Sequence, residues 1–295
     1  MRLIRRPSQA LSAFQSGSVV TIGAFDGLHL GHRRILKRLQ QAADEHQLPA
    51  LVFSFEPTPK EYFSLGTPPA RLMSFREKFE TLEELGIDSF LCPVFDQSMA
   101  QMAPHEFIDQ LLVELLRVKH VIVGDDFRFA QKRSGHVGHL QNKGLDNDFT
   151  VEQVTSVIES GQRVSSTVVR EALISGNLEM ARHLLGRYYR MSGKVVEGQR
   201  LGRTLGMPTA NVKLNRQISP VQGIFAVRVL GLAAGTEKND VLPGVVSIGT
   251  RPTIGGTEPL LEVHIFDFDQ DIYGAHLQVE FVAKLRDEVR FDSLD

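Results

Sequence analysis

Two histidines, His29 and His32, are the first residues in this chain that could do chemistry, because both follow directly on a glycine bend. The run before the bend, Val19–Ile22, is β-branched and apolar and predicts a buried strand. Gly23 and Gly27 permit a tight turn. A spacing of three allows both imidazoles to face one side of the helix that follows, whose N-terminus suits phosphate. The stretch therefore predicts a cradle for the phosphates of a nucleotide.

A second group of polar residues occurs in the string V-S-S-T-V-V-R, residues 164–170. Ser165, Ser166 and Thr167 are good N-cap residues, so capping of the next helix explains them without any ligand. The same hydroxyls could hold triphosphate oxygens while Arg170 neutralises charge. The residues alone leave both explanations open.

A third group lies in the string G-Q-R-L-G-R-T-L-G-M-P-T-A-N, residues 198–211. Glycines interleaved with Arg200 and Arg203 indicate a loop that closes on phosphate, although glycine-rich hairpins are common without a ligand. Thr209 and Asn211 offer neutral oxygen ligands. Mg²⁺ takes few protein ligands of this kind and also binds the phosphates of its substrate.

Alternating strands and helices must position the first site. Strands are predicted at 19–22, 49–55, 90–95, 120–124 and 149–154, and helices at 31–46, 71–85 and 104–116. This order predicts a parallel sheet covered on both faces, with ligands beyond the carboxyl ends of its strands. Glu56-Pro57 and Asp125-Asp126 fall at those ends, so one shared site is expected. The two aspartates could form a metal pair, but hydrogen bonding to a ribose or flavin group, or simple capping, is at least as good an explanation.

The second half of the chain has a different pattern. A last helix over 176–185 precedes short strand-like runs at 189–196, 224–229, 241–248, 260–268 and 276–282, separated by glycine- and proline-rich turns. This predicts an all-β barrel. Alternation in the run 260–268 places Glu262, His264 and Phe266 on one face. A glutamate on a barrel strand is most often a solvated surface residue, and His264 is interpreted as structural.

Composition limits the remaining possibilities. The 295 residues are 42% hydrophobic and 23% charged, which fits two globular domains, and a net charge of −2 gives no basic footprint for nucleic acid. The single Cys92, in an apolar run, is expected to be a buried thiol in a reducing compartment. Arg2, Arg5 and Arg6 faintly resemble a transit peptide, but the first strand leaves only a short leader. No apolar run approaches membrane-span length. We expect a cytoplasmic protein with small-molecule substrates and no nucleic-acid or membrane partner; oligomeric state is not indicated.

The string G-A-F-D-G-L-H-L-G-H resembles the H-x-G-H signature of nucleotidyltransferases, most closely that of bacterial FAD synthetases, and residues 164–170 resemble the I-S-S-T-x-x-R motif of the same family. The resemblance implies an ATP site made of Gly23, Phe25, Asp26, His29, His32, Ser165, Ser166, Thr167 and Arg170. It gives the histidines the task of stabilising charge as pyrophosphate leaves. It also implies that Phe55 and Asp126 line the flavin and nucleotide pocket.

The segment that ends in P-T-A-N resembles the G-R-x-L-G-x-P-T-A-N signature of riboflavin kinases. The resemblance implies a phosphate loop containing Gly198, Gly202 and Arg203, with Mg²⁺ of MgATP held by Thr209 and Asn211. It implies that Glu262 is the base for the ribityl hydroxyl. The final string, L-R-D-E-V-R-F-D-S-L-D, resembles a flavin-holding segment in which Arg286 and Phe291 would act.

Together these resemblances imply an FMN adenylyltransferase domain at 1–186 and a riboflavin kinase domain at 187–295, with ATP, riboflavin, FMN and FAD as substrates and products. Ala130, Ser247 and the lack of a helix after Asp295 depart from the family pattern. Three alternatives remain at this point. They are a flavin- or nucleotide-binding regulator with decayed catalysis, an adenylyltransferase for another phosphate acceptor such as phosphopantetheine, and an RNA enzyme similar to tRNA synthetases.

Overall fold

The computed structural model describes residues 1–198, 207–232, 241–253 and 256–288, and the chain divides into two compact units. The first contains residues 1–69 and 78–164, and the second contains residues 70–77 and 165–295. No helix among the described residues has both the length and the apolar character that a membrane crossing requires. The predicted fold class, a parallel α/β sheet followed by an all-β barrel, is confirmed.

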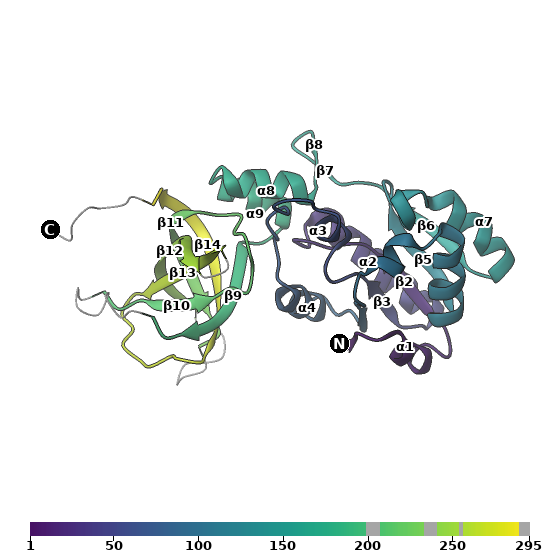
Figure 1. Ribbon diagram of the computed structural model, residues 1–295, viewed down its shortest axis with the longest axis horizontal. Helices are drawn as coiled ribbons and strands as arrows, with labels where there is room; N and C mark the ends of the chain where they lie inside the picture. The colour runs from purple at the N-terminus through teal and green to yellow at the C-terminus, as the bar shows by residue number, and fades with distance from the viewer. Residues whose placement is uncertain (199–206, 233–240, 254–255, 289–295) are drawn as a thin grey trace. The chain divides into compact units, whose positions relative to one another are not determined.

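A six-stranded parallel sheet forms the centre of the first unit (Figure 1), in the order β1-β4-β3-β2-β5-β6. Its strands are β1 (Arg2–Ile4), β2 (Ser18–Ile22), β3 (Ala50–Phe53), β4 (Ser89–Leu91), β5 (Val118–Gly124) and β6 (Thr150–Val154). Strand β1 pairs with β4 at the edge of the sheet. The sequence did not predict this strand, because its residues were interpreted as part of a short leader. The strand order reverses between β2 and β5, and ligands of such sheets bind at this switch point.

Helices connect the strands of the first unit. They are α1 (Pro7–Ala13), α2 (Leu30–His46), α3 (Pro59–Tyr62), α4 (Phe75–Glu84), α5 (Gln97–Gln101), α6 (Pro104–Glu106), the π-helix η1 (Phe107–Leu115), the 3₁₀ turn η2 (Gln131–Arg133) and α7 (Val137–Asn147). A small hairpin follows β6, made of β7 (Ile158–Glu159) and β8 (Gln162–Arg163).

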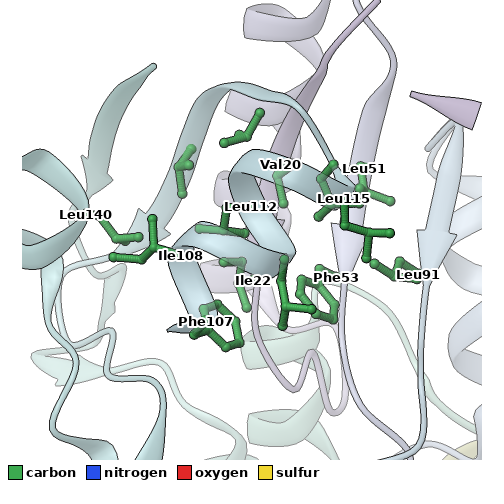
Figure 2. Packing of buried hydrophobic residues seen from close by; sticks show 14 of the residues in the cluster. Val20, Ile22, Leu51, Phe53, Leu91, Phe107, Ile108, Leu112, Leu115 and Leu140 are labelled. Carbon is green, nitrogen blue, oxygen red and sulfur yellow. The ribbon is translucent and has the colours of Figure 1, made fainter. Parts of the chain in front are cut away.

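Apolar side chains of the sheet and of η1 form the core of the first unit. Figure 2 shows side chains of η1 packed over the strands, with Leu112 and Leu115 near residues of β2 and β3 and with Ile108 beside Leu140. Each such buried side chain contributes about 1.5–3 kcal/mol. Strand β2 is buried along its whole length, and its two hydroxyls are satisfied because Ser18 donates to Leu116 O and Thr21 donates to Ile122 O, each at 2.7 Å. The core thus fixes the strand that leads into the glycine bend.

Helix α4 begins later than the predicted start at residue 71. Ser74 and Glu77 form a reciprocal cap, in which the Ser74 amide donates to Glu77 Oε2 at 2.6 Å and the Glu77 amide donates to Ser74 Oγ at 3.3 Å. Such a pair marks a helix N-terminus. The helix therefore starts at Phe75, and residues 70–74 precede it as irregular chain.

The second unit contains a closed antiparallel barrel in the order β10-β13-β12-β11-β14-β9. Helices α8 (Ser166–Ile174) and α9 (Leu178–Leu185) precede the strands β9 (Tyr189–Val196), β10 (Ala210–Lys213), β11 (Gly223–Leu230), β12 (Leu242–Thr253), β13 (Gly256–Ile265) and β14 (His276–Arg286). The sequence predicts five of these strands; β10, which starts inside P-T-A-N, was not predicted. Leu261, Val263 and Ile265 are at most 5% exposed, so the predicted face with Glu262 points outward from the barrel.

Candidate active sites

The glycine bend that follows β2 is strained and tightly held. The Gly23 amide donates to Phe53 O at 3.0 Å, which ties the start of the bend to β3. Phe25 and Leu28 have φ values of 49° and 44°, a region that few residues other than glycine adopt. Backbone strain of this kind is found where a structure positions a ligand. The bend ends where His29 becomes the N-cap of α2.

The two histidines of the bend lie against each other. The His32 amide donates to Nδ1 of His29 at 3.3 Å, and the two rings stack with centroids 3.7 Å apart at 17°. The Phe25 ring lies 5.1 Å from the His32 ring. Spacing therefore predicted the common side of the helix correctly, and both imidazoles lie at the N-terminus of α2, at the switch point of the sheet.

Burial determines the charge of His32. His29 is 6% exposed, and Nδ1 of His32 is buried without a hydrogen-bond partner among the described residues. Burial lowers the pKa of His32 well below its usual value, and the nearby His29 and Lys78 lower it further. His32 is therefore a neutral imidazole in the free protein at neutral pH. Lys78, which no sequence motif included, donates from Nζ to Ala24 O in the bend at 2.7 Å.

Aromatic side chains gather beyond the carboxyl end of β3. The half-buried ring of Phe55 lies 5.3 Å from that of Phe95, edge to face. Tyr62 and Phe63 also contact Phe95, at 5.2 and 5.8 Å, and are 39% and 58% exposed. Only Phe55 of this group was expected. Tyr62 and Phe63 stand at the end of α3 in no recognised motif, and Phe95 follows β4, which adjoins β3 only in the folded sheet.

The carboxylates after β5 are held by polar groups of the chain. Asp125 accepts from the Ser156 amide and hydroxyl at 2.8 and 2.7 Å, and the hydroxyl bond is the main cause of its lowered pKa. Asp126 pairs with Arg163 of β8 at 2.9 Å. No cluster of three metal-binding side chains occurs among the described residues. Both carboxylates are thus bonded to polar groups of the chain, and a role of this pair at a ribose, a flavin or a metal stays a prediction.

The hydroxyl motif at 165–167 lies at the start of α8 in the second unit. Ser165 is the N-cap, and its side chain accepts from the Val168 amide at 3.4 Å. Arg170 donates from Nε to Ala70 O at 2.7 Å. The capping explanation of Ser165 is therefore correct, and a part in ATP binding stays a prediction for Ser165, Ser166, Thr167 and Arg170.

Strand register assembles the second site on the outer face of the barrel. Asn211 of β10 is paired with Glu262 of β13, and Glu262 is paired on its other side with Ser247 of β12. Directly paired residues share a face of a sheet, so an amide, a carboxylate and a hydroxyl lie in one row. Asn211 is 8% exposed, and its amide lies so close to Gly198 that a side chain there would collide with it.

A pocket of about 390 Å³ is lined by Ala210 and Val263, a directly paired couple whose side chains lie on the opposite face of the strands from this row. Thr209 lines it together with apolar side chains of β9 and β13 and with the segment 268–273, whose role the sequence did not indicate. Nδ1 of His264 lies 2.8 Å from Pro208 O, and because a carbonyl only accepts, His264 donates this bond. This bond agrees with a structural role for His264, because it holds Pro208, the residue before Thr209, in place.

The end of β14 lies near the same row. Ser247 Oγ donates to Glu288 Oε1 at 3.4 Å, and Arg286 donates to Asp287 O at 3.1 Å. Gly202 and Arg203 of the predicted phosphate loop, and Phe291 of the predicted flavin segment, lie outside the described residues.

The chain combines a parallel sheet, which carries a stacked histidine pair at its switch point, with a barrel that has a pocket of its own. Family models agree with this division: FAD synthetase matches residues 11–168 and riboflavin kinase matches residues 185–295. The bifunctional riboflavin kinase/FMN adenylyltransferase of Escherichia coli K12 is 49% identical over 295 residues, covering 100% of this chain and 93% of the relative. That of Haemophilus influenzae is 45% identical, covering 100% and 94%.

A solved structure of similar fold is that of a Streptococcus pneumoniae protein described as a macrolide-efflux protein. It has a TM-score of 0.80 and 31% identity, covering 94% of this chain and 89% of its own. The chain belongs to the family of bifunctional riboflavin kinase/FMN adenylyltransferases.

Proposed function

We propose that the chain makes FAD from riboflavin in two steps at two sites. The barrel transfers the γ-phosphate of ATP to the ribityl 5′-hydroxyl of riboflavin and forms FMN and ADP. At the first site, a phosphate oxygen of FMN attacks the α-phosphorus of a second ATP. The bond from that phosphorus to the bridging oxygen breaks, and pyrophosphate leaves. The observation that carries the second step is the stacked His29–His32 pair at the N-terminus of α2.

Positioning and electrostatics supply the chemistry of adenylyl transfer, because neither step needs a protein nucleophile. His29 and His32 are proposed to hydrogen-bond the phosphates, aided by the amides of the helix N-terminus. Gly23, Phe25 and Asp26 would form the wall of this ATP site, and a part in ATP binding is likewise proposed for Ser165, Ser166, Thr167 and Arg170.

The aromatic group around Phe95 is proposed to carry the flavin ring of FMN. Exposed aromatic faces stack well on a flat heterocycle, and Phe55, Tyr62 and Phe63 offer such faces beside the carboxyl edge of the sheet. Asp126 is proposed to line the same pocket, where its pairing with Arg163 would hold it in place.

Glu262 is proposed to accept the proton of the ribityl hydroxyl during phosphoryl transfer. The donor set beside it fits Mg²⁺, because the amide of Asn211 and the hydroxyl of Thr209 are hard neutral oxygens that leave room for phosphate ligands. When bound, Mg²⁺ would neutralise charge on the transferred phosphoryl group. The pocket beside Thr209 is proposed to hold the adenosine of ATP, with Gly198, Gly202 and Arg203 over its phosphates.

Arg286 and Phe291 are proposed to hold riboflavin at the kinase site. The functional division at 186/187 is likewise a proposal, as is a cytoplasmic protein whose partners are these small molecules. The family membership supports the small-molecule substrates, and the net charge of −2 gives no basic footprint for nucleic acid.

Two substitutions test the assignment of the steps. Glu262→Ala is expected to reduce FMN formation at least about 100-fold and to leave FMN adenylylation within about twofold, and His32→Ala is expected to do the reverse. The products are separated by chromatography after incubation with riboflavin, or with FMN, and MgATP.

The chain offers a matched control for the histidine. His136-Val137-Gly138-His139 repeats the string H-x-G-H at the N-terminus of α7, with rings 4.0 Å apart. His139→Ala is expected to change neither activity by more than about twofold. Loss of both activities in either single variant would refute the two-site assignment, and a wild-type protein that forms neither product would be a binding regulator.

A further inference from the structure

Lys78 is a buried lysine in the first unit that no motif of the sequence includes. The residue is 3% exposed, and its Nζ donates to Ala24 O at 2.7 Å. Ala24 is the second residue of the G-A-F-D-G bend, so this side chain reaches from α4 to the backbone of the phosphate cradle.

Stability does not explain a lysine at this position. A buried ammonium group is costly unless an opposite charge accompanies it. Within the described part of the chain, Lys78 pairs with no carboxylate, and its Nζ bonds only the Ala24 carbonyl. That bond occupies one of three N–H groups. An apolar side chain would suit the folded protein better, so the charge is expected to serve an anionic ligand.

The surroundings of Lys78 are those of an anion site. After burial, the charges of His29 and Lys78 both lower the pKa of His32, so the positive field of the Lys78 ammonium group reaches the neutral His32 ring. The stacked His29–His32 pair lies on the same bend whose carbonyl Lys78 holds. Phosphate oxygens bound in the cradle would enter this field.

The second H-x-G-H string separates the contribution of the lysine from that of the histidines. His136 and His139 are also linked at a helix N-terminus, with the His136 amide donating to Nδ1 of His139 at 3.3 Å. His136 is exposed, and the cation that acts on it is the exposed Arg128. The H-x-G-H string and the helix N-terminus thus occur both at His29–His32 and at His136–His139. Among the described residues, a buried ammonium group is found only near the first of these pairs.

We propose that Lys78 is a further residue of the adenylyl-transfer site, a fixed positive charge that stabilises the pyrophosphate as it leaves. The inference rests on the proposed FMN adenylylation. When the bond to the α-phosphorus breaks, its electron pair passes to the bridging oxygen, and negative charge increases on the pyrophosphate. A preorganised cation near the bend lowers the energy of this state more than that of bound ATP.

The test compares Lys78→Met, which removes the charge at similar length, with Lys78→Arg, which retains it. With FMN and MgATP, Lys78→Met in the full chain is expected to lower kcat for FAD formation 10- to 100-fold, and Lys78→Arg is expected to restore most of that loss. Lys143→Met is the matched control, because Lys143 lies in the same unit and is paired with Asp109 at 2.7 Å. It is expected to change kcat by less than twofold.

Inhibition by the product pyrophosphate, compared with inhibition by AMP, distinguishes a charge effect from a distorted site. In Lys78→Met, the inhibition constant of pyrophosphate against FMN adenylylation is expected to rise at least 10-fold, and that of AMP less than threefold. Riboflavin phosphorylation by the same variant reports that the chain is folded and is expected to be unchanged. His32 should titrate at a higher pH in Lys78→Met than in wild type, as followed by NMR.

Equal rises of both inhibition constants, an unchanged kcat in Lys78→Met, or no rescue by Lys78→Arg would each overturn the role of Lys78. Failure of the wild-type protein to form FAD would instead overturn the proposed function.

Discussion

At the scale of single residues, His120 shows how burial sets the charge of a side chain outside either site. It is 8% exposed on β5, with Nδ1 2.6 Å from Thr150 Oγ1 and Nε2 3.5 Å from Glu152 Oε2. Burial lowers the pKa of His120, and the nearby His46 and Arg38 also lower it, while Glu152 acts in the opposite direction. The folded protein therefore favours the neutral ring.

This lowered pKa gives stability a definite pH dependence. Below the ordinary histidine pKa of about 6.5, the unfolded chain binds a proton that folded His120 resists, so the stabilisation is complete above that value and is lost as pH falls towards the folded pKa. His120→Gln is expected to flatten the rise in unfolding free energy between about pH 5 and pH 7, measured with urea. His183→Gln, a change at an exposed histidine, should keep the wild-type slope. An unchanged slope in His120→Gln would contradict the assignment.

Motifs made some site residues predictable and left others hidden. The local spacing of His29, His32 and Asn211 already indicates chemistry, and the structure adds their orientation and register. The role expected of Glu262 came only from the resemblance to riboflavin kinases, because its strand pattern indicates a surface residue. Lys78 stands in F-R-E-K-F-E-T-L-E-E, which reads as the charged face of a surface helix. Its burial depends on a contact with Ala24, 54 positions earlier, and no local pattern records such a contact.

At the scale of elements, the first turn of α4 is joined to the barrel by a buried ion pair. Glu77 Oε2 accepts from Arg216 Nη2 at 2.5 Å, and the two side chains are 2% and 1% exposed. Glu77 Oε1 accepts from the Ser192 amide of β9 at 2.6 Å, and Arg216 Nη1 also donates to the Tyr189 hydroxyl at 3.1 Å. These bonds give the buried carboxylate and guanidinium groups hydrogen-bond partners, which offsets much of the free-energy cost of burying them.

Removing one partner of this pair is expected to be far more harmful than removing both. Arg216→Met should lower the unfolding free energy of the barrel by about 3–5 kcal/mol, because Glu77 is left as a buried charge. The double variant Glu77→Gln, Arg216→Met should recover most of that loss. Denaturant unfolding, followed by hydrogen exchange of barrel amides, measures both.

A surface pair provides the control for this prediction. Lys119 Nζ and Asp148 Oδ2 are 2.9 Å apart, but the two side chains are 43% and 95% exposed. Lys119→Met should therefore lower the unfolding free energy far less than Arg216→Met does, because solvent screens an exposed pair. A similar loss in Lys119→Met and Arg216→Met would contradict burial as the cause.

Strand and helix positions followed from the hydrophobic pattern where the pattern was long, as in β2, β5 and α2. Strands that the sequence did not predict include β1, which has only three residues, and β10, whose first residues belong to the motif P-T-A-N and were interpreted as a ligand-binding loop. Sheet order and the close pairing of Asn211, Glu262 and Ser247 depend on contacts between segments distant in sequence. Such contacts are set by packing of the whole unit rather than by local propensity.

At the scale of the whole molecule, the chain passes between its two units three times, after residues 69, 77 and 164. The proposed functional division at 186/187 follows the change from alternating helices and strands to strands alone. The compact second unit also includes residues 70–77 and both helices of 165–185. Composition cannot reveal the membership of 70–77, since eight residues within the first half of the sequence carry no barrel pattern.

This membership predicts how a fragment of residues 187–295 will behave. The fragment keeps Arg216 but lacks Glu77 and the Arg71 carbonyl, to which Arg216 donates at 3.2 Å in the full chain. Its barrel should therefore unfold at a lower denaturant concentration than the barrel of the full chain. Arg216→Met, which costs about 3–5 kcal/mol when Glu77 is present, should cost less than about 1 kcal/mol in the fragment, because no partner charge is stranded. Unfolding curves of the full chain and the fragment, each with and without Arg216→Met, give the coupling free energy directly. An equal cost of Arg216→Met in the fragment and the full chain would mean that residues 187–295 alone hold Arg216.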